Sequence, residues 1–144
     1  MKISSEELEQ LTREVWATMI GLDLADAVMA ENPDPGVTSQ IEIHGDEQAT
    51  LRIDCSMDLA RQVAARLFDM SPEEIEMELI LDAMGEMANV IGGQVKGQWS
   101  GAVKLSLPVT KEVGDADSAM TWSVSQGFSA EDGQMLVRMN SSAA

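Results

Sequence analysis

The sequence contains a single cysteine, Cys55, so it cannot form a disulfide within one chain. Sparse cysteine is typical of a reducing compartment, and we expect a cytoplasmic protein. Aromatic residues make up only 3% of the chain, and tyrosine is absent. Methionine is instead plentiful, with 11 residues. A core rich in methionine is adaptable in shape rather than rigid.

Basic residues are also scarce. The chain has 9 Lys and Arg against 25 Asp and Glu, which gives a formal net charge of −16 at pH 7. Nucleic-acid binding needs basic patches, and so does attachment to anionic membranes, so we expect neither as a partner. No apolar run approaches 18 residues, and the N-terminus, MKISSEELEQ, is too polar for a signal peptide.

The residue sets of several common enzyme classes are missing. There is one histidine, His44, and no Ser-His-Asp set, metal-ligand cluster or phosphate-cradling glycine loop is evident. The alternation of its strand puts His44 on an exposed face, without a partner at ligand spacing. Cys55 lies in phase with apolar neighbours, and we expect a buried, unreactive thiol.

At 144 residues the chain is most simply one domain, 1–144, able to bury about two-thirds of its surface. Hydrophobic periodicity predicts helices and strands in separate groups, which favours an α+β fold with a largely antiparallel sheet. The expected helices are 4–21, 57–68 and 71–96. Ser4 and Glu7 form a capping box at the start of the first, and Ser56 is expected to cap the second. The expected strands are 37–44, 51–55, 103–107, 120–125 and 135–139. The first two are expected to form a hairpin and the last three a meander. Loops or turns are expected at 30–36, 111–118 and 129–133, with a frayed tail at 140–144.

The longest expected helix is SPEEIEMELILDAMGEMANVIGGQVK, from Ser71 to Lys96. Ser71 and Glu74 form an S-x-x-E capping box, and Pro72 suits the first helical position. At 100° per residue, one continuous apolar stripe faces a core. Its members are Ile80, Met84, Met87, Ile91 and Val95.

Nearly opposite runs a polar stripe, here named the acidic stripe. It consists of Glu78, Asp82, Glu86, Asn89 and Gly93. Carboxylates four residues apart repel each other by roughly 0.2–0.5 kcal/mol per pair, and a helical glycine costs about 1 kcal/mol against alanine. Two interpretations are open: an ordinary solvated face of an acidic protein, or a surface kept for a partner.

The segment Asp82-Ala-Met-Gly-Glu86-Met-Ala-Asn89 resembles the signature of the CheC/CheX family of chemotaxis phosphatases. That pattern is an Asp or Ser, three residues, Glu, two residues, Asn, and a proline downstream. All three helical positions match, and Pro108 follows after 18 residues, about four fewer than in the family pattern. The signature occurs once, as in the CheX-like single-motif type.

The resemblance implies hydrolysis of the aspartyl phosphate on a CheY-like response regulator. By the family's logic, Asn89 holds the attacking water and Glu86 pairs with a lysine of the regulator. Asp82 and Glu78 would support the partner interface, and Gly93 would give clearance. The Mg²⁺ would belong to the regulator, so no cofactor of this chain's own is expected. The resemblance also implies a homodimer.

The competing function class is a non-enzymatic docking module. Flagellar-switch domains related to the family share the fold and bind partners without hydrolysis. The presence of Glu86 together with Asn89 favours the phosphatase, whereas the acidic stripe alone would suit either function.

Overall fold

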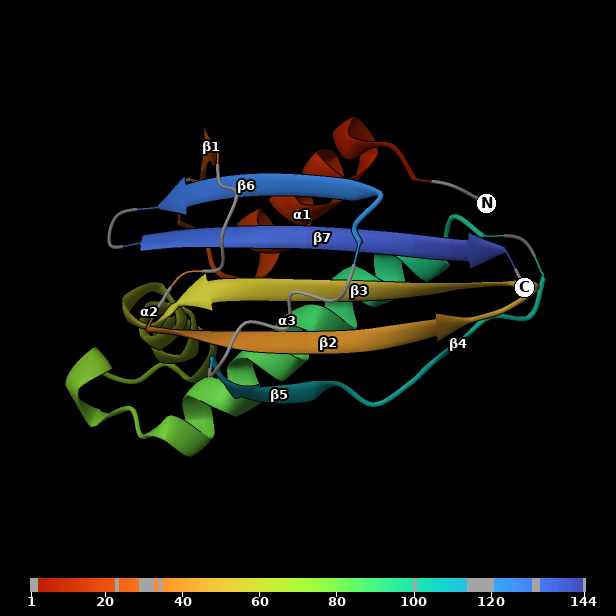
Figure 1. The fold of residues 1–144 in the computed structure, drawn as a ribbon. Coiled ribbons are helices and arrows are strands. Elements are labelled where there is room, and N and C mark those ends of the chain that lie inside the picture. Colours follow the sequence, from red (N-terminus) through yellow and green to blue (C-terminus); the bar gives the residue numbers. More distant parts are fainter. Residues whose placement is uncertain are drawn as a thin grey trace.

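The computed structural model describes residues 3–22, 24–28, 33, 35–99, 101–113, 121–130 and 133–143. One sheet has the α-helices on one of its faces (Figure 1). The helices are α1 (Ser5–Met19), α2 (Met57–Phe68), the short 3₁₀ helix η1 (Pro72–Glu74) and α3 (Met77–Lys96). The strands are β1 (Ala25–Ala27), β2 (Gly36–His44), β3 (Glu47–Ser56), β4 (Lys104–Leu105), β5 (Val109–Glu112), β6 (Val124–Ala130) and β7 (Gly133–Ala143).

The sheet has the strand order β1-β6-β7-β3-β2-β4, and β5 also pairs with β2. Every pairing is antiparallel. The expectation of an α+β fold with an antiparallel sheet is therefore confirmed. Helix α3 lies behind β2 and β3, and α1 lies behind β6 and β7 (Figure 1).

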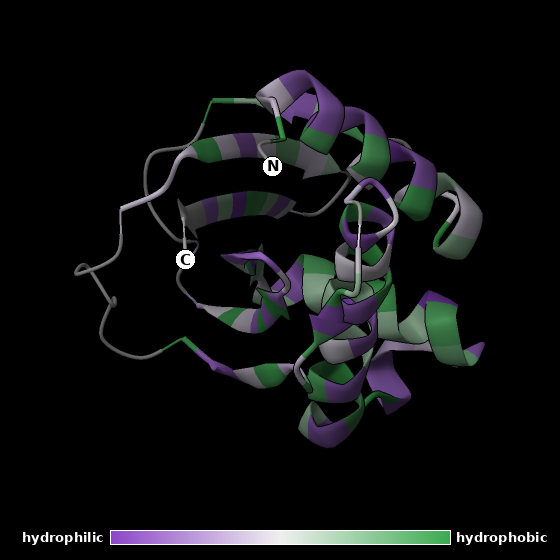
Figure 2. Cartoon of the chain, turned by 90° about the vertical axis from the view of Figure 1, so that its right-hand side faces the viewer, coloured by the Kyte–Doolittle hydropathy of each residue, from purple (hydrophilic) through white to green (hydrophobic). Residues whose placement is uncertain are grey.

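The core lies between the helices and one face of the sheet. Hydrophobic and hydrophilic residues alternate along the strands (Figure 2), because successive side chains of a strand point to opposite faces. On β2, Val37, Ile41 and Ile43 are fully buried. Their strand partners on β3, Leu51 and Cys55 among them, are buried on the same face.

The other face of the sheet is polar but well packed. Arg138 Nη2 lies 2.8 Å from Asp54 Oδ2, and the Asp54 side chain is buried. The Trp122 ring lies 5.4 Å from the Arg52 guanidinium carbon and 4.9 Å from that of Arg138. Cation–π contacts and an ion pair therefore cover part of this face in place of a second helical layer.

Several local expectations are confirmed. Helix α1 begins with the predicted capping box, because Glu7 N donates to Ser4 Oγ at 3.1 Å and Ser4 N donates to Glu7 Oε1 at 3.2 Å. Helix α2 has the predicted bounds, and β2 and β3 form the predicted hairpin. Ser56 precedes α2, but its hydroxyl accepts from Gln134 N at 3.1 Å and does not cap the helix.

The predicted start of the long helix at Ser71 is wrong. Helix α3 begins at Met77, after η1 and an extended residue, Ile75. In a continuous helix, Ile75 would lie on the acidic stripe, about 160° from the centre of the apolar stripe. The break lets it become buried, and Arg61 Nη1 donates to the freed Ile75 carbonyl at 2.6 Å. Ser71 instead donates to Glu73, which lowers the pKa of that carboxyl.

The predicted three-strand meander is also wrong. Of 103–107 only Lys104–Leu105 is a strand, and β5 runs into the expected loop 111–118. Both β4 and β5 pair with β2, whereas β6 and β7 lie on the other side of β3. Short segments with little apolar alternation, such as Val109–Glu112, become strands here because an edge partner is available.

The last two strands differ from the sequence expectation at their ends. Strand β6 begins at Val124 rather than near 120 and runs through Ala130, inside the expected turn 129–133; residues 131–132 lie outside the described part. Strand β7 continues to Ala143, pairing with β3, so residues 140–143 of the tail expected to fray are strand, and residue 144 lies outside the described part. Strand β1, which pairs with β6, was not expected at all. Most of the predicted 30–36 turn and residues 114–118 of the predicted loop are outside the described residues.

Candidate functional site

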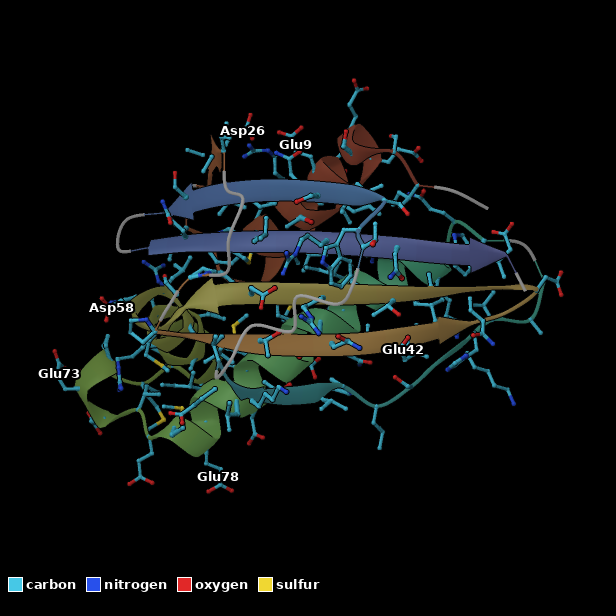
Figure 3. The ribbon with its side chains drawn as sticks, viewed as in Figure 1. Glu9, Asp26, Glu42, Asp58, Glu73 and Glu78 are labelled. Carbon is cyan, nitrogen blue, oxygen red and sulfur yellow. The ribbon has the colours of Figure 1, made fainter. Side chains whose placement is uncertain are left out.

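Helix α3 presents two different faces. All five members of the predicted apolar stripe are fully buried against the sheet and neighbouring helices. On the opposite side, Glu78, Asp82, Glu86 and Asn89 are exposed, and Gly93 is half-buried. Glu78 projects from α3 into solvent (Figure 3). The exposure of the acidic stripe is therefore as the periodicity predicts.

The acidic stripe borders a depression of about 680 Å³ between α3 and the segment that joins β4 to β5. The structure thus brings four predicted site residues together with a distant part of the chain. The lining residues are Glu78, Leu81, Asp82, Gly85, Glu86, Asn89, Leu107, Pro108 and Thr110. Gly93 is not among them and lies beyond one end.

Gly85 allows the β4–β5 segment to approach α3 closely. A β-carbon at Gly85 would lie 3.2 Å from Thr110 Oγ1 and 3.5 Å from Pro108 Cγ. Thr110 is itself held by Ser39, with 2.7 Å between the two hydroxyl oxygens. Glycine therefore fixes the width of the depression, and the shortened spacing from Asn89 to Pro108 still brings Pro108 to the signature helix.

The other two glycines of α3 have different environments. A β-carbon at Gly92 would lie 3.3 Å from Ile41 Cγ2, so this glycine lets α3 approach β2. At Gly93, by contrast, no atom lies within 4 Å of that position. Close packing therefore explains the glycine at Gly92 but not the one at Gly93.

The site residues make few interactions within the chain. Over the described ranges, no hydrogen bond or ion pair engages the side chains of Asp82, Glu86 or Asn89. Two carboxylates and one carboxamide therefore face solvent unpaired in the described part of the chain. Such groups can bind a cation and orient a water molecule.

The residues set aside on sequence grounds stay outside the site. His44 is exposed at the end of β2, and Cys55 is buried in β3. Burial raises the pKa of the Cys55 thiol, and the neighbouring Asp54 raises it further. Among the described residues, no group of three or more His, Cys, Asp or Glu could hold a metal ion. None of the helices in that part of the chain combines the length and hydrophobicity needed to cross a membrane.

Sequence reasoning missed the second wall of the depression. Leu107 and Thr110 line it, yet Leu107 is only the end of an expected strand, Thr110 belongs to no expected element, and the sequence indicates a role for neither. The available signal is Pro108, which belongs to the family signature and is the neighbour of Leu107 in the sequence.

Comparison with known proteins supplies the family. The sequence model described as "Chemotaxis phosphatase CheX" matches residues 37–125, more than half of the chain, including α3 and Pro108. No curated protein matches the chain.

Solved structures share the fold. Chemotaxis protein CheX from Vibrio vulnificus has a TM-score of 0.77 at 17% identity, over 94% of this chain and 93% of that chain. A chain of the CheX–CheY–BeF3–Mg²⁺ complex from Borrelia burgdorferi has a TM-score of 0.76 at 16% identity, over 97% and 99%. A chain of the FliM–SpeE complex from H. pylori has a TM-score of 0.59 at 9% identity, over 94% and 81%.

These likenesses agree with the antiparallel sheet, and the family match includes the helix that carries the Asp82, Glu86 and Asn89 signature. The chain therefore belongs to the CheX family of chemotaxis phosphatases.

Proposed function

We propose that this protein hydrolyses the aspartyl phosphate of a CheY-like response regulator that docks on the acidic stripe. The observation that carries the proposal is the position of Glu86 and Asn89. They lie three residues apart on one exposed face of α3, border one depression and are unpaired among the described residues.

Asn89 is the proposed catalytic residue. An acyl phosphate is a mixed anhydride and is already activated, so a large part of the gain can come from placing a water in line with the phosphorus. A carboxamide can hold this water through its oxygen or its nitrogen and does not titrate. The rate should therefore depend on the geometry of Asn89 rather than on its protonation state.

Glu86 is proposed to bind a lysine of the regulator and so fix the register of docking. Asp82 and Glu78 extend the same negative surface, which would repel a free phosphate ester but attract a protein that carries its own cation. The Mg²⁺ is expected on the regulator. Association should be transient and should slow as salt is added, because the attraction is between exposed charges.

The solved complex of a CheX with a CheY from Borrelia burgdorferi supports a CheY-like domain as the partner class. The name of the matching family supports the phosphatase activity. We expect the protein to act in the cytoplasm.

The experiment is a panel of response regulators phosphorylated in vitro, each followed for loss of phosphate with and without this protein. At least one regulator should lose phosphate faster, and Asn89→Ala should abolish most of that gain. Retention of full activity by Asn89→Ala on the responsive regulator would refute the proposed mechanism.

A non-enzymatic docking module is the second candidate. The likeness to a chain of the FliM–SpeE complex supports it, because one fold can carry more than one function. The same panel separates the two: a docking module would bind a phosphorylated regulator without changing its lifetime.

A homodimer is a separate prediction. Strands β1 and β4 end the sheet in the described part of the chain, and open edges can pair with a second copy. Light scattering coupled to gel filtration measures this, and a molar mass near 15.5 kDa would contradict it.

A further inference from the structure

An apolar side chain stands exposed on the wall of the depression opposite the acidic stripe. Leu107 has a relative exposure of 86%. Over the described residues, five large hydrophobic side chains are exposed: Val28, Phe68, Met70, Leu107 and Val109. Of these, Leu107 is the one that lines the depression with Glu86 and Asn89.

The backbone on both sides of Leu107 is held in place. Ser106 N donates to Glu42 O at 2.9 Å, and Glu42 N donates to Ser106 Oγ at 2.9 Å. On the other side, Pro108 lies against Gly85 and Thr110 is bonded to Ser39. The position of Leu107 is thus fixed by both the sheet and the signature helix.

Val109 is also exposed, but its side chain points in a different direction from the depression. Thr110 faces α3, and successive strand residues face opposite sides, so Val109 points to the outer face of the sheet. Leu107 therefore belongs to the depression, whereas Val109 does not.

We propose that Leu107 is the apolar anchor of the docking surface and contacts an apolar recess on the regulator beside its lysine. The proposal rests on the proposed function and adds a property to the partner. The regulator must present a cation and, across the width of the depression, an apolar surface. Buried apolar anchors supply much of the affinity of small interfaces, whereas exposed charge pairs mainly set orientation and association rate.

The pairing of the two walls argues for one partner. The acidic stripe and Leu107 border the same depression, so a protein that places its lysine near Glu86 also covers Leu107. A regulator with a polar residue in place of the recess would leave Leu107 in water and bind more weakly. Leu107 would then help to select among regulators that share the same lysine and aspartyl phosphate.

The test uses the regulator that responds in the panel, activated with beryllofluoride for binding and phosphorylated for turnover. Leu107→Ser should raise Kd and KM about tenfold, equivalent to about 1.4 kcal/mol, and leave kcat within about twofold. Leu107→Met, which keeps the apolar volume, should restore binding. Val28→Ser is the matched control, because Val28 is also an exposed apolar residue but follows β1 at the far edge of the sheet, and it should change neither constant.

The outcomes separate this inference from the proposed function. An unchanged Kd for Leu107→Ser, with Asn89→Ala inactive, would overturn the anchor and leave the phosphatase standing. An active Asn89→Ala would overturn the phosphatase mechanism whatever Leu107 does. A lower molar mass for Leu107→Ser than for the parent would mean that Leu107 contacts a second copy of this chain, and would overturn the anchor.

Discussion

The two faces of α3 differ in what they do for the fold. The buried face places Ile80, Met84 and Ile91 in the core at zero exposure. The exposed face has carboxylates four residues apart and a glycine, Gly93, with no neighbouring atom to require it. The buried face stabilises the fold. The like charges and the glycine of the exposed face lower helix stability, so stability does not explain them. The exposed face lowers helix stability and borders a depression, and both properties agree with the proposal that it binds another protein.

The largest expected effect is on the exposed face. Asn89→Ala should lower the dephosphorylation rate by about 100-fold, because the water is no longer held in line. The free energy of unfolding should change by less than about 0.5 kcal/mol, since Asn89 is exposed and makes no hydrogen bond over the described ranges. Phosphate release and urea unfolding measure the two quantities. A large loss of stability in Asn89→Ala with normal activity would mean that Asn89 serves the fold and not the reaction.

Ile91→Ala is the matching change on the buried face. It removes a fully buried side chain and should lower the free energy of unfolding by about 2–5 kcal/mol. At temperatures below the unfolding transition, the activity per folded molecule should be unchanged, because Ile91 faces away from the depression. Urea unfolding combined with the phosphatase assay tests this. Inactivity of a folded variant would mean that the two faces are coupled.

Glu86→Gln tests whether charge sets docking. We expect Kd for the responsive regulator to rise by on the order of tenfold at low salt, because a cation loses its partner. The difference from the parent protein should shrink at 0.5 M salt, where charges are screened over a few ångströms. Titration at two salt concentrations measures it. An equal loss of affinity at both would mean that Glu86 acts through its shape and not through its charge.

The two faces could be predicted from the sequence because they depend on local periodicity alone. Once α3 forms, the 100° step decides which residues face the core. The start of α3 could not be predicted, because the burial of Ile75 and the contact with Arg61 depend on α2. These tertiary contacts outweighed the Ser71 capping signal.

The depression has the same dependence on distant contacts. It needs Pro108 beside Gly85, which follows from the pairing of β4 and β5 with β2. The sequence predicted a strand near Leu107 but not its partner, since short edge strands carry little pattern of their own. Strand β1 was missed for the same reason: Ala-Asp-Ala has low strand propensity and depends on β6.

Gly93→Ala should stabilise the protein. No atom lies near the added methyl group, so the helix should gain about 1 kcal/mol. Gly85→Ala is the contrasting variant, because its methyl group would press on Thr110 and offset the same gain. Thermal unfolding compares the two. If Gly93 gives the regulator clearance, the stabilised variant should also bind it more weakly; unchanged binding would remove Gly93 from the interface.

Asp82→Asn should give the smallest effect and the most direct test of the exposed face. The change relieves repulsion from Glu78 and Glu86, each pair contributing roughly 0.2–0.5 kcal/mol, so the free energy of unfolding should rise slightly. If the acidic stripe were only a solvated face, this small gain would be the whole result. If the stripe docks a cationic protein, the same variant should also associate more slowly with the regulator at low salt. Stopped-flow association rates distinguish these results, and an unchanged rate would indicate that Asp82 lies outside the docking surface.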